Sequence, residues 1–137
     1  MLFILFILIL TTPLVTSADT DSAEKPIVYA VLMHADWCGS CKVLDPKITQ
    51  ARENNGLDEK NVLFITLDLT NETTSHQAAM MADVLEITEL YESNAGKTGF
   101  MVLIDSKTGD PISRITKSLD AESISEQVLE AIKIVNS

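Results

Sequence analysis

The run IVYAVLM at residues 27–33 most restricts how this 137-residue chain can fold. It is rich in β-branched residues and apolar at both odd and even positions, which is the pattern of a strand buried on both faces. Two further runs, NVLFITLDL at 61–69 and FMVLID at 100–105, predict two more buried strands. Strands covered on both faces require helices on either side of their sheet, so the chain is predicted to be an α/β protein.

Helical patterns fill the segments between these strands. The first helix is predicted at about residues 38–55, and Gly56 supplies a left-handed stop after it. Its apolar face is expected to comprise Val43, Leu44, Ile48 and Ala51. A second, long helix is predicted to begin at Ser75 and to end near Gly96. Its apolar face is expected to comprise Met81, Val84, Leu85, Thr88 and Tyr91.

After the third strand, the pattern predicts a hairpin and a final helix. The turn SKTGDP leads into ISRITK (112–117), a weaker strand whose Arg114 and Lys117 suit an exposed edge. Asp120 can cap the last helix, with Leu119 packing on Ile124. Its apolar stripe is expected to comprise Ile124, Val128, Ile132 and Val135. The predicted order is therefore β-α-β-α-β-β-α, with a central mixed four-stranded sheet that has a parallel pair and a closing antiparallel hairpin.

Residues 1–18 have the composition of an export signal. Residues 2–10 form an unbroken apolar run, and Thr16-Ser17-Ala18 offers the small residues of a cleavage site, although no Lys or Arg precedes the run. The run is shorter than the roughly 20 apolar residues that span a bilayer, so cleavage is favoured over retention as an uncleaved anchor. The remainder, a polar tail at 19–25 and one domain at 26–137, is expected to be periplasmic or secreted.

Charge restricts the partners of this domain. All 20 acidic and 10 basic residues follow Ala18, so the exported part keeps the net charge of −10. An acidic protein is repelled by nucleic acids and by anionic membrane surfaces. We therefore expect neither a nucleic acid nor a nucleotide as a partner.

The only two cysteines, Cys38 and Cys41, lie in HADWCGSCKVLDP at residues 34–46. In an exported chain they could form a structural disulfide. However, a bridge over two intervening residues closes a very small loop, and the entropic gain from a disulfide grows with loop length. Redox chemistry or metal binding is therefore favoured over a purely structural role.

The predicted elements place Cys38 directly after a strand and at the start of a helix. Backbone N–H groups and the helix dipole favour a thiolate there, and the thiolate is the nucleophile in disulfide exchange. Cys41 lies one turn further along the same helix face. We therefore expect Cys38 to be the exposed attacking sulfur and Cys41 the sheltered resolving sulfur. Gly39 and Ser40 leave room for the first turn, and Trp37 is expected to lie flat beside the pair as a docking surface.

The segment WCGSCKVLDP resembles the active-site segment of the thioredoxin superfamily. The shared residues are Trp37, Cys38, Gly39, Cys41, Lys42 and Pro46, the last at the position where family members kink the first helix. The resemblance covers about residues 26–135. It implies a thioredoxin-like fold and an exported thiol:disulfide oxidoreductase, with protein thiols or disulfides as substrates and a membrane or periplasmic redox partner. We further expect a monomer that binds no metal and needs no cofactor beyond the redox-active disulfide.

Two positions depart from the family's pattern. Members usually have a buried acid six residues before the first cysteine, where this chain has Leu32. His34 is the nearby titratable alternative, unless it is a partly buried strand-end residue without chemistry. Members also usually have a cis-proline before the third strand, where this chain has Gly99 after Thr98. A cis bond at a non-proline residue costs about 2.5–4 kcal/mol, so we expect a trans peptide, a more open site, and a backbone edge at Thr98 and Gly99 for an extended substrate.

Two other functions stay open. Without the proline, the cysteines could bind Cu(I) or zinc with His34 or His76 as a further ligand, although this is an incomplete set for a closed zinc site. The domain could also be a redox-inert binding module that merely retains the disulfide. Met80 and Met81 could then belong to a partner surface, although methionines at helical spacing are more often part of a core.

Overall fold

The structure is a computed structural model that describes residues 25–137. The predicted export signal and most of the polar tail lie outside the described residues. The strands are β1 (Val28–His34), β2 (Val62–Asp68), β3 (Phe100–Asp105) and β4 (Pro111–Thr116). The helices are α1 (Gly39–Asn55), α2 (Glu72–Val84), α3 (Thr88–Ser93) and α4 (Ala121–Asn136), with a short 3-10 helix η1 (Leu57–Glu59) after α1. The predicted order is confirmed, except that two helices replace the predicted second one.

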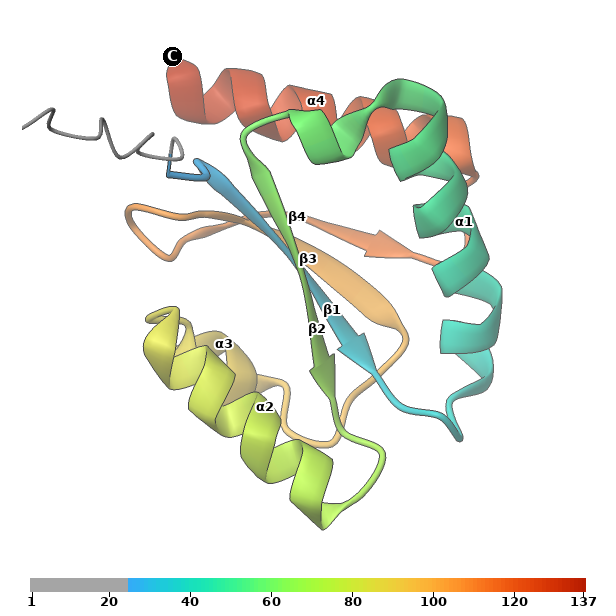
Figure 1. The fold of residues 1–137 in the computed structure, drawn as a ribbon, viewed down its shortest axis with the longest axis vertical. Helices are drawn as coiled ribbons and strands as arrows, with labels where there is room; N and C mark the ends of the chain where they lie inside the picture. Colours follow the sequence, from blue (N-terminus) through green and yellow to red (C-terminus); the bar gives the residue numbers. More distant parts are fainter. Residues whose placement is uncertain (1–24) are drawn as a thin grey trace, which may run out of the picture.

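The strands form one four-stranded sheet in the order β2-β1-β3-β4. β1 and β2 are parallel, whereas β3 is antiparallel to both β1 and β4. Helices α1 and α4 cover one face of this sheet, and α2 and α3 cover the other (Figure 1). The mixed sheet, its parallel pair and the closing hairpin are therefore confirmed, and β4 is an edge strand on which Arg114 is exposed.

Alternation along β1 divides the core into two parts. Val28, Ala30 and Leu32 pack under α1 and α4, whereas the odd-numbered residues of β1 pack under α2 and α3. Successive side chains of a strand point to opposite faces, so an apolar run without alternation is buried on both. The same parity places His34, at the end of β1, on the α1 side of the sheet.

The ends of α1 and α4 follow their capping residues. Gly56 ends α1 in the left-handed region with a φ of 56°, as predicted. Asp120 caps α4 by accepting a hydrogen bond from the Ser123 N–H at 2.8 Å. Ile124 and Val128 are buried, and Leu119, Ile132 and Val135 pack against the same core, which confirms the stripe. On α1, the predicted face is confirmed at Leu44, Ile48 and Ala51, but Val43 is exposed.

The predicted long helix over residues 75–96 is wrong in its bounds. Asn71 caps α2 at an earlier position, where its side chain accepts from the Thr74 N–H and the Thr74 hydroxyl group contacts the Asn71 backbone. The helix ends at Val84, because Glu86 adopts a left-handed conformation with a φ of 59°. A separate helix, α3, then begins at Thr88.

The predicted apolar face of this region is wrong at Met81 and Val84, whereas Leu85 and Tyr91 do pack against the core. Ala78 and Ala82 are the buried residues of α2, whereas Met80, Met81 and Val84 are exposed. Small side chains let a helix lie close against the sheet, so the face of α2 that contacts the sheet is its alanine face. The methionines are not part of the core. Within residues 25–137, no helix is both long and apolar enough to cross a bilayer.

Candidate functional site

Cys38 and Cys41 form a disulfide at the start of α1. Cys38 is the N-cap residue of this helix, and its Sγ accepts a hydrogen bond from the Cys41 N–H at 3.2 Å. Cys38 is 6% exposed and Cys41 is fully buried. The expected order of accessibility is thus present, but the expectation of an exposed Cys38 sulfur is wrong for this oxidised form.

Gly99 packs directly against the cysteine pair. A Cβ atom at this position would lie 2.6 Å from the Ser40 Cβ and 3.2 Å from the Cys38 Sγ. Its φ of +88° is in a region that favours glycine. The peptide bond is trans as expected, since residues 25–137 contain no cis peptide. The loop backbone at Gly99 therefore packs against Ser40 and Cys38 without space for a side chain.

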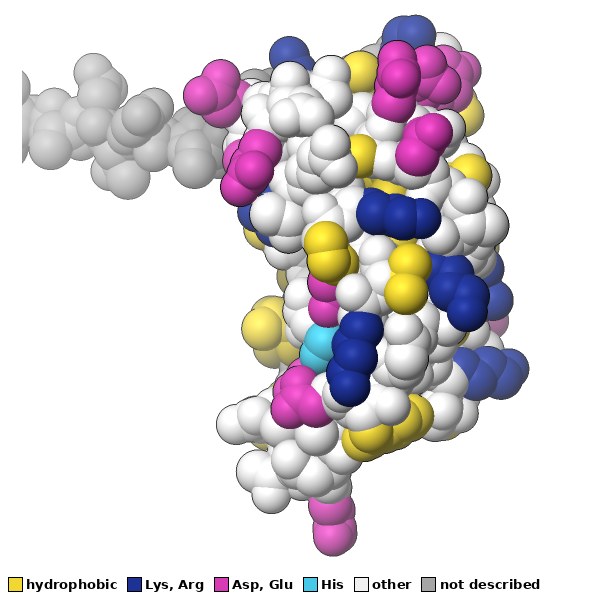
Figure 2. Space-filling view, turned by 90° about the vertical axis from the view of Figure 1, so that its right-hand side faces the viewer, with side chains coloured by type: hydrophobic (Ala, Val, Ile, Leu, Met, Phe, Trp, Pro, Cys, Tyr) yellow, Lys and Arg dark blue, Asp and Glu magenta, His cyan; other side chains and the backbone are white. Residues whose placement is uncertain are grey.

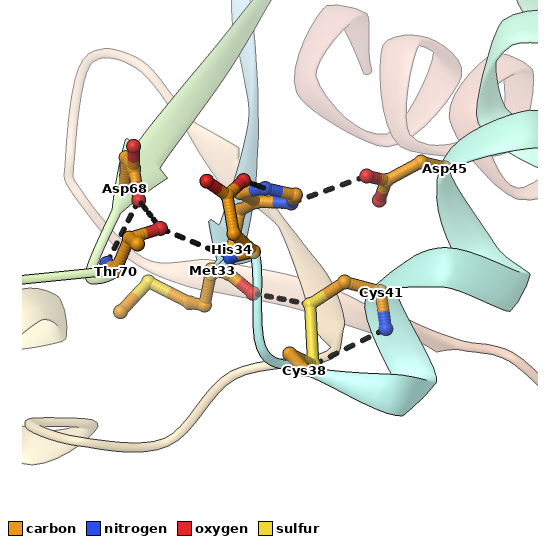
Figure 3. The surroundings of a disulfide bond; sticks show 8 residues. Met33, His34, Cys38, Cys41, Asp45, Asp68 and Thr70 are labelled. Carbon is orange, nitrogen blue, oxygen red and sulfur yellow. Dashed lines mark hydrogen bonds and ion pairs between the residues drawn. A yellow bond between two sulfur atoms is a disulfide. The ribbon is translucent and has the colours of Figure 1, made fainter.

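The carbonyl group of Met33 connects this loop to the resolving sulfur. It accepts a hydrogen bond from the Gly99 N–H at 2.8 Å. The Cys41 Sγ lies 3.8 Å from the same oxygen (Figure 3). The end of β1, the start of α1 and the loop before β3 therefore meet at one backbone atom, while Thr98 lies half-buried beside Gly99.

Trp37 lies on the loop between β1 and α1, with 61% of its surface exposed. Its indole Nε1–H donates to the Thr70 carbonyl at 3.0 Å. The Asp36 N–H donates to the Thr70 hydroxyl at 2.9 Å, so Thr70 holds the loop at two points. An apolar surface beside the disulfide is thus fixed in orientation.

Three carboxylates surround His34. Its Nδ1 lies 3.1 Å from Asp45 Oδ2 on α1, and its Nε2 lies 3.4 Å from Asp36 Oδ1 (Figure 3). The third is Asp68, at the end of β2, which pairs with His34 in the sheet register. The Thr70 hydroxyl, by donating to Asp68, holds the pKa of that carboxyl below its ordinary value, and the Thr70 N–H and His34 act in the same direction.

A family model described as Thioredoxin matches residues 18–117, which is more than half of the chain. The chain belongs to the thioredoxin family. With a Cys-x-x-Cys pair in disulfide contact at the start of α1, it is a thiol:disulfide oxidoreductase. Thioredoxin-family proteins of this type act on the thiols and disulfides of other proteins.

Several solved structures share this fold. A thioredoxin from Malassezia sympodialis has a TM-score of 0.51 and 18% identity, over 78% of this chain and 79% of its own. StoA from Bacillus subtilis has a TM-score of 0.50 and 16% identity, over 76% and 84%. Trxlp from Edwardsiella tarda has a TM-score of 0.50 and 14% identity, over 75% and 82%. No curated protein sequence matches the chain.

The other residues that the sequence suggested for the site of this thioredoxin-family domain are exposed. Gly39 is exposed, and nothing lies within 4 Å of the position that a Cβ would take there. Lys42 is exposed on α1, and Lys and Arg side chains gather on this side of the molecule (Figure 2). His76 is exposed on α2. Within residues 25–137, no group of three or more His, Cys, Asp or Glu side chains is arranged to hold a metal ion.

Four residues of the site were not predicted: Met33, Asp45, Asp68 and Thr70. Met33 contributes only its backbone carbonyl, for which no residue-type signal exists. Asp68 and Thr70 follow the strand that pairs in parallel with β1, and parallel strands end at the same edge of a sheet. Asp45 follows Cys41 by four residues on a helix, a spacing that places two side chains on one face. The sequence therefore contained a signal for Asp68 and Thr70 and another for Asp45.

Proposed function

We propose that this protein is an exported oxidoreductase that exchanges disulfides with protein partners, with Cys38 as the attacking sulfur and Cys41 as the resolving sulfur. The observation that carries the assignment is the position of Cys38 as the N-cap of α1, where its sulfur accepts the Cys41 N–H. In the reduced protein, this N–H and the dipole of the helix favour a thiolate at Cys38. Cys41 has no exposed surface from which to attack a partner.

The exchange proceeds in two displacements. The Cys38 thiolate attacks one sulfur of a partner disulfide, forming a mixed disulfide and releasing the other partner sulfur as a thiolate. The Cys41 thiolate then attacks Cys38 Sγ, which restores the Cys38–Cys41 bond and releases the second partner sulfur. The partner gains two electrons and the protein loses two. The reverse sequence oxidises a partner dithiol, and no cofactor beyond the disulfide is needed in either direction.

The surroundings of the pair favour an extended protein segment as substrate. Trp37 offers an exposed ring that Thr70 holds in place. The Gly99 N–H is already bonded to Met33, so Thr98 is the residue of this loop whose backbone is the better candidate for contact with a substrate strand. We expect a monomer that docks a membrane or periplasmic redox partner on this surface.

A trapping experiment tests the assignment of the two sulfurs. In Cys41→Ser, the mixed disulfide cannot be resolved, so it should accumulate with insulin or with a partner from an extracytoplasmic fraction. Cys38→Ser is the matched control and should trap nothing. The wild type should reduce insulin in the presence of dithiothreitol, and both variants should lose this activity. Equal trapping by Cys38→Ser would contradict the assignment.

Export has its own test. Expression of the full chain in a bacterial host, followed by mass spectrometry of the protein from each fraction, should yield a species that begins at Asp19 outside the cytoplasm. The apolar run at residues 2–10 and the small residues before Asp19 support this result. A full-length species in the membrane fraction would show that residues 1–18 stay as an anchor. A full-length species in the cytoplasm would contradict export.

A further inference from the structure

The resolving step needs a group that accepts the proton of Cys41, and Leu32 cannot be that group. Cys41 must lose a proton before it attacks the mixed disulfide, yet it is fully buried. Burial in apolar surroundings opposes the ionisation of a thiol. Leu32 occupies the strand position at which an acid is expected by resemblance, and it is packed in the core with Leu44 and Met101. The proton acceptor is therefore either water or a side chain from another element.

Asp45 is the carboxylate that α1 brings to Cys41. Residues four apart in a helix have Cβ atoms about 5–6 Å apart, and helical side chains lean toward the N-terminus. The side chain of Asp45 therefore leans toward the turn that carries Cys41. In Figure 3 the carboxylate of Asp45 and the ring of His34 face each other on the side of β1 where Cys41 lies.

The two oxygens of Asp45 have different surroundings. Oδ2 lies 3.1 Å from His34 Nδ1, but this contact is not a hydrogen bond, because that nitrogen is also buried without a hydrogen-bond partner. Oδ1 is buried and has no hydrogen-bond partner. A buried carboxylate oxygen is rarely left without a partner, because the cost of desolvation is then not repaid. In the oxidised form Cys41 has no thiol hydrogen to offer, and reduction of the disulfide supplies one.

A cavity gives this carboxylate a route to solvent. It has a volume of about 200 Å³, lies between α1 and β2, and is lined by Leu32, Asp45, Thr49 and Arg52 among others. The side chain of Asp45 is 37% exposed, so a proton taken up at its buried oxygen can leave through its exposed part. Other charged groups near the pair are Asp36 in the loop after β1 and Asp68 at the end of β2.

We propose that Asp45, which lies beside His34 on the turn of α1 after Cys41, accepts the proton of the Cys41 thiol in the resolving step. The S–H bond of Cys41 breaks, the proton goes to Asp45, and the thiolate electron pair forms the bond to Cys38 Sγ. The bond between Cys38 and the partner sulfur breaks, and its electron pair leaves with that sulfur. Asp45 then returns its proton to solvent. The inference rests on the proposed roles of the two cysteines, and its test separates the two claims.

The test follows a symmetrical aromatic disulfide whose thiolate absorbs visible light. Mixed in excess with reduced protein, it releases one thiolate when Cys38 attacks and a second when Cys41 resolves. In Asp45→Asn and Asp45→Ala, the second release should be about 100-fold slower at pH 7, the lower end of what general base catalysis contributes, while the first is unchanged. Its rate should rise about tenfold per pH unit, because only the free thiolate fraction then reacts. Asp45→Glu should recover most of the rate.

Asp36→Asn is the matched control, because it removes another carboxylate that faces His34 but lies in the loop and is 81% exposed. Its second release should match the wild type in rate and in pH profile. A wild-type pH profile for the second release in Asp45→Asn and Asp45→Ala overturns the role of Asp45, and so does an equal loss in Asp36→Asn. If the first release is absent in the wild type as well, the oxidoreductase assignment of Cys38 fails instead.

Discussion

At the scale of single residues, Gly99 determines how closely two segments approach at the disulfide. Its Cα is close enough that a Cβ atom would collide with Ser40 and make a tight contact with the sulfur of Cys38. A proline at this position would carry the same Cβ and fix φ near −65°, whereas the observed φ is +88°. The departure from the family's pattern is therefore a different local packing, in which backbone replaces a ring, rather than an empty space.

Gly99→Ala should destabilise the protein for two reasons, which a matched variant separates. A left-handed conformation costs a non-glycine residue about 1–2 kcal/mol, and overpacking adds about 1–3 kcal/mol. Gly96→Ala carries only the first cost, because Gly96 also has a positive φ but no atom within 4 Å of its Cβ position. Urea denaturation should therefore show a larger loss in the free energy of unfolding for Gly99→Ala.

The collision itself has a second check. Ser40→Gly removes the Cβ that lies nearest to the new methyl group. The double variant Ser40→Gly with Gly99→Ala should therefore lose less free energy of unfolding than the sum of the losses in the two single variants. Additive effects in this cycle, or equal losses in Gly99→Ala and Gly96→Ala, would refute the packing explanation.

What the sequence could predict at this scale depends on how local the signal is. Cys38, Cys41 and Trp37 lie within one short segment whose flanking strand and helix are themselves strongly patterned. The contact of Gly99 with the disulfide was expected only from the alignment with the family, and its closeness was not. The contact of Trp37 with Thr70 joins residues 33 positions apart, so no pattern within either segment specifies it.

At the scale of elements, the break between α2 and α3 is the largest difference from expectation. Leu85, Glu86 and Ile87 include neither Gly nor Pro, so no helix-breaking residue marks the break. The left-handed conformation at Glu86 turns the chain so that Ile87 is buried on the α2 side of the sheet. Burial of Ile87 thus outweighs the local preference for a continuous helix, which explains why periodicity alone misled the prediction.

Glu86→Gly should stabilise the protein, because glycine adopts a positive φ without the steric cost. Removing the left-handed conformation of a non-glycine residue should stabilise the fold by about 1–2 kcal/mol. The greater backbone entropy of glycine in the unfolded chain should offset about 0.5–1 kcal/mol of this gain. Thermal and urea unfolding should show an increase of roughly 0.5–1 kcal/mol, by the same two terms. Glu89→Gly, at an exposed position inside α3, is the control and should lower stability. A loss of stability in both variants would refute the strain at Glu86.

The elements that were predicted well are those whose signals agree with each other. The strands β1, β2 and β3 are apolar runs of ordinary strand length, and α4 has a cap, a staple and a stripe in register. On α2, alanines and methionines compete for the buried face, and hydrophobicity favours the wrong one. Close packing against the sheet selects Ala78 and Ala82, which a hydrophobicity pattern alone does not anticipate.

At the scale of the whole molecule, one strand organises both halves of the core. β1 lies between β2 and β3 and has buried residues on each face. The two-sided burial was predicted from IVYAVLM alone, and it led to the layers, the helix placement and the parallel pair. To predict that β1 pairs with β3 as well as with β2, the full order of helices and strands was required. The charge on the α1 side could not be predicted from the acidic total, because it depends on which face each basic residue takes (Figure 2).

The Met33 carbonyl has a consequence for how the oxidation state can be observed. It receives the Gly99 N–H and lies next to the Cys41 sulfur, which carries a hydrogen only in the reduced form. On reduction, the S–S bond beside this oxygen is replaced by two separate sulfurs, so the surroundings of the Gly99 amide change. The chemical shift of the Gly99 amide should therefore differ between the oxidised and reduced forms. NMR can follow this shift in isotope-labelled protein mixed with an unlabelled partner, without a probe attached to either sulfur.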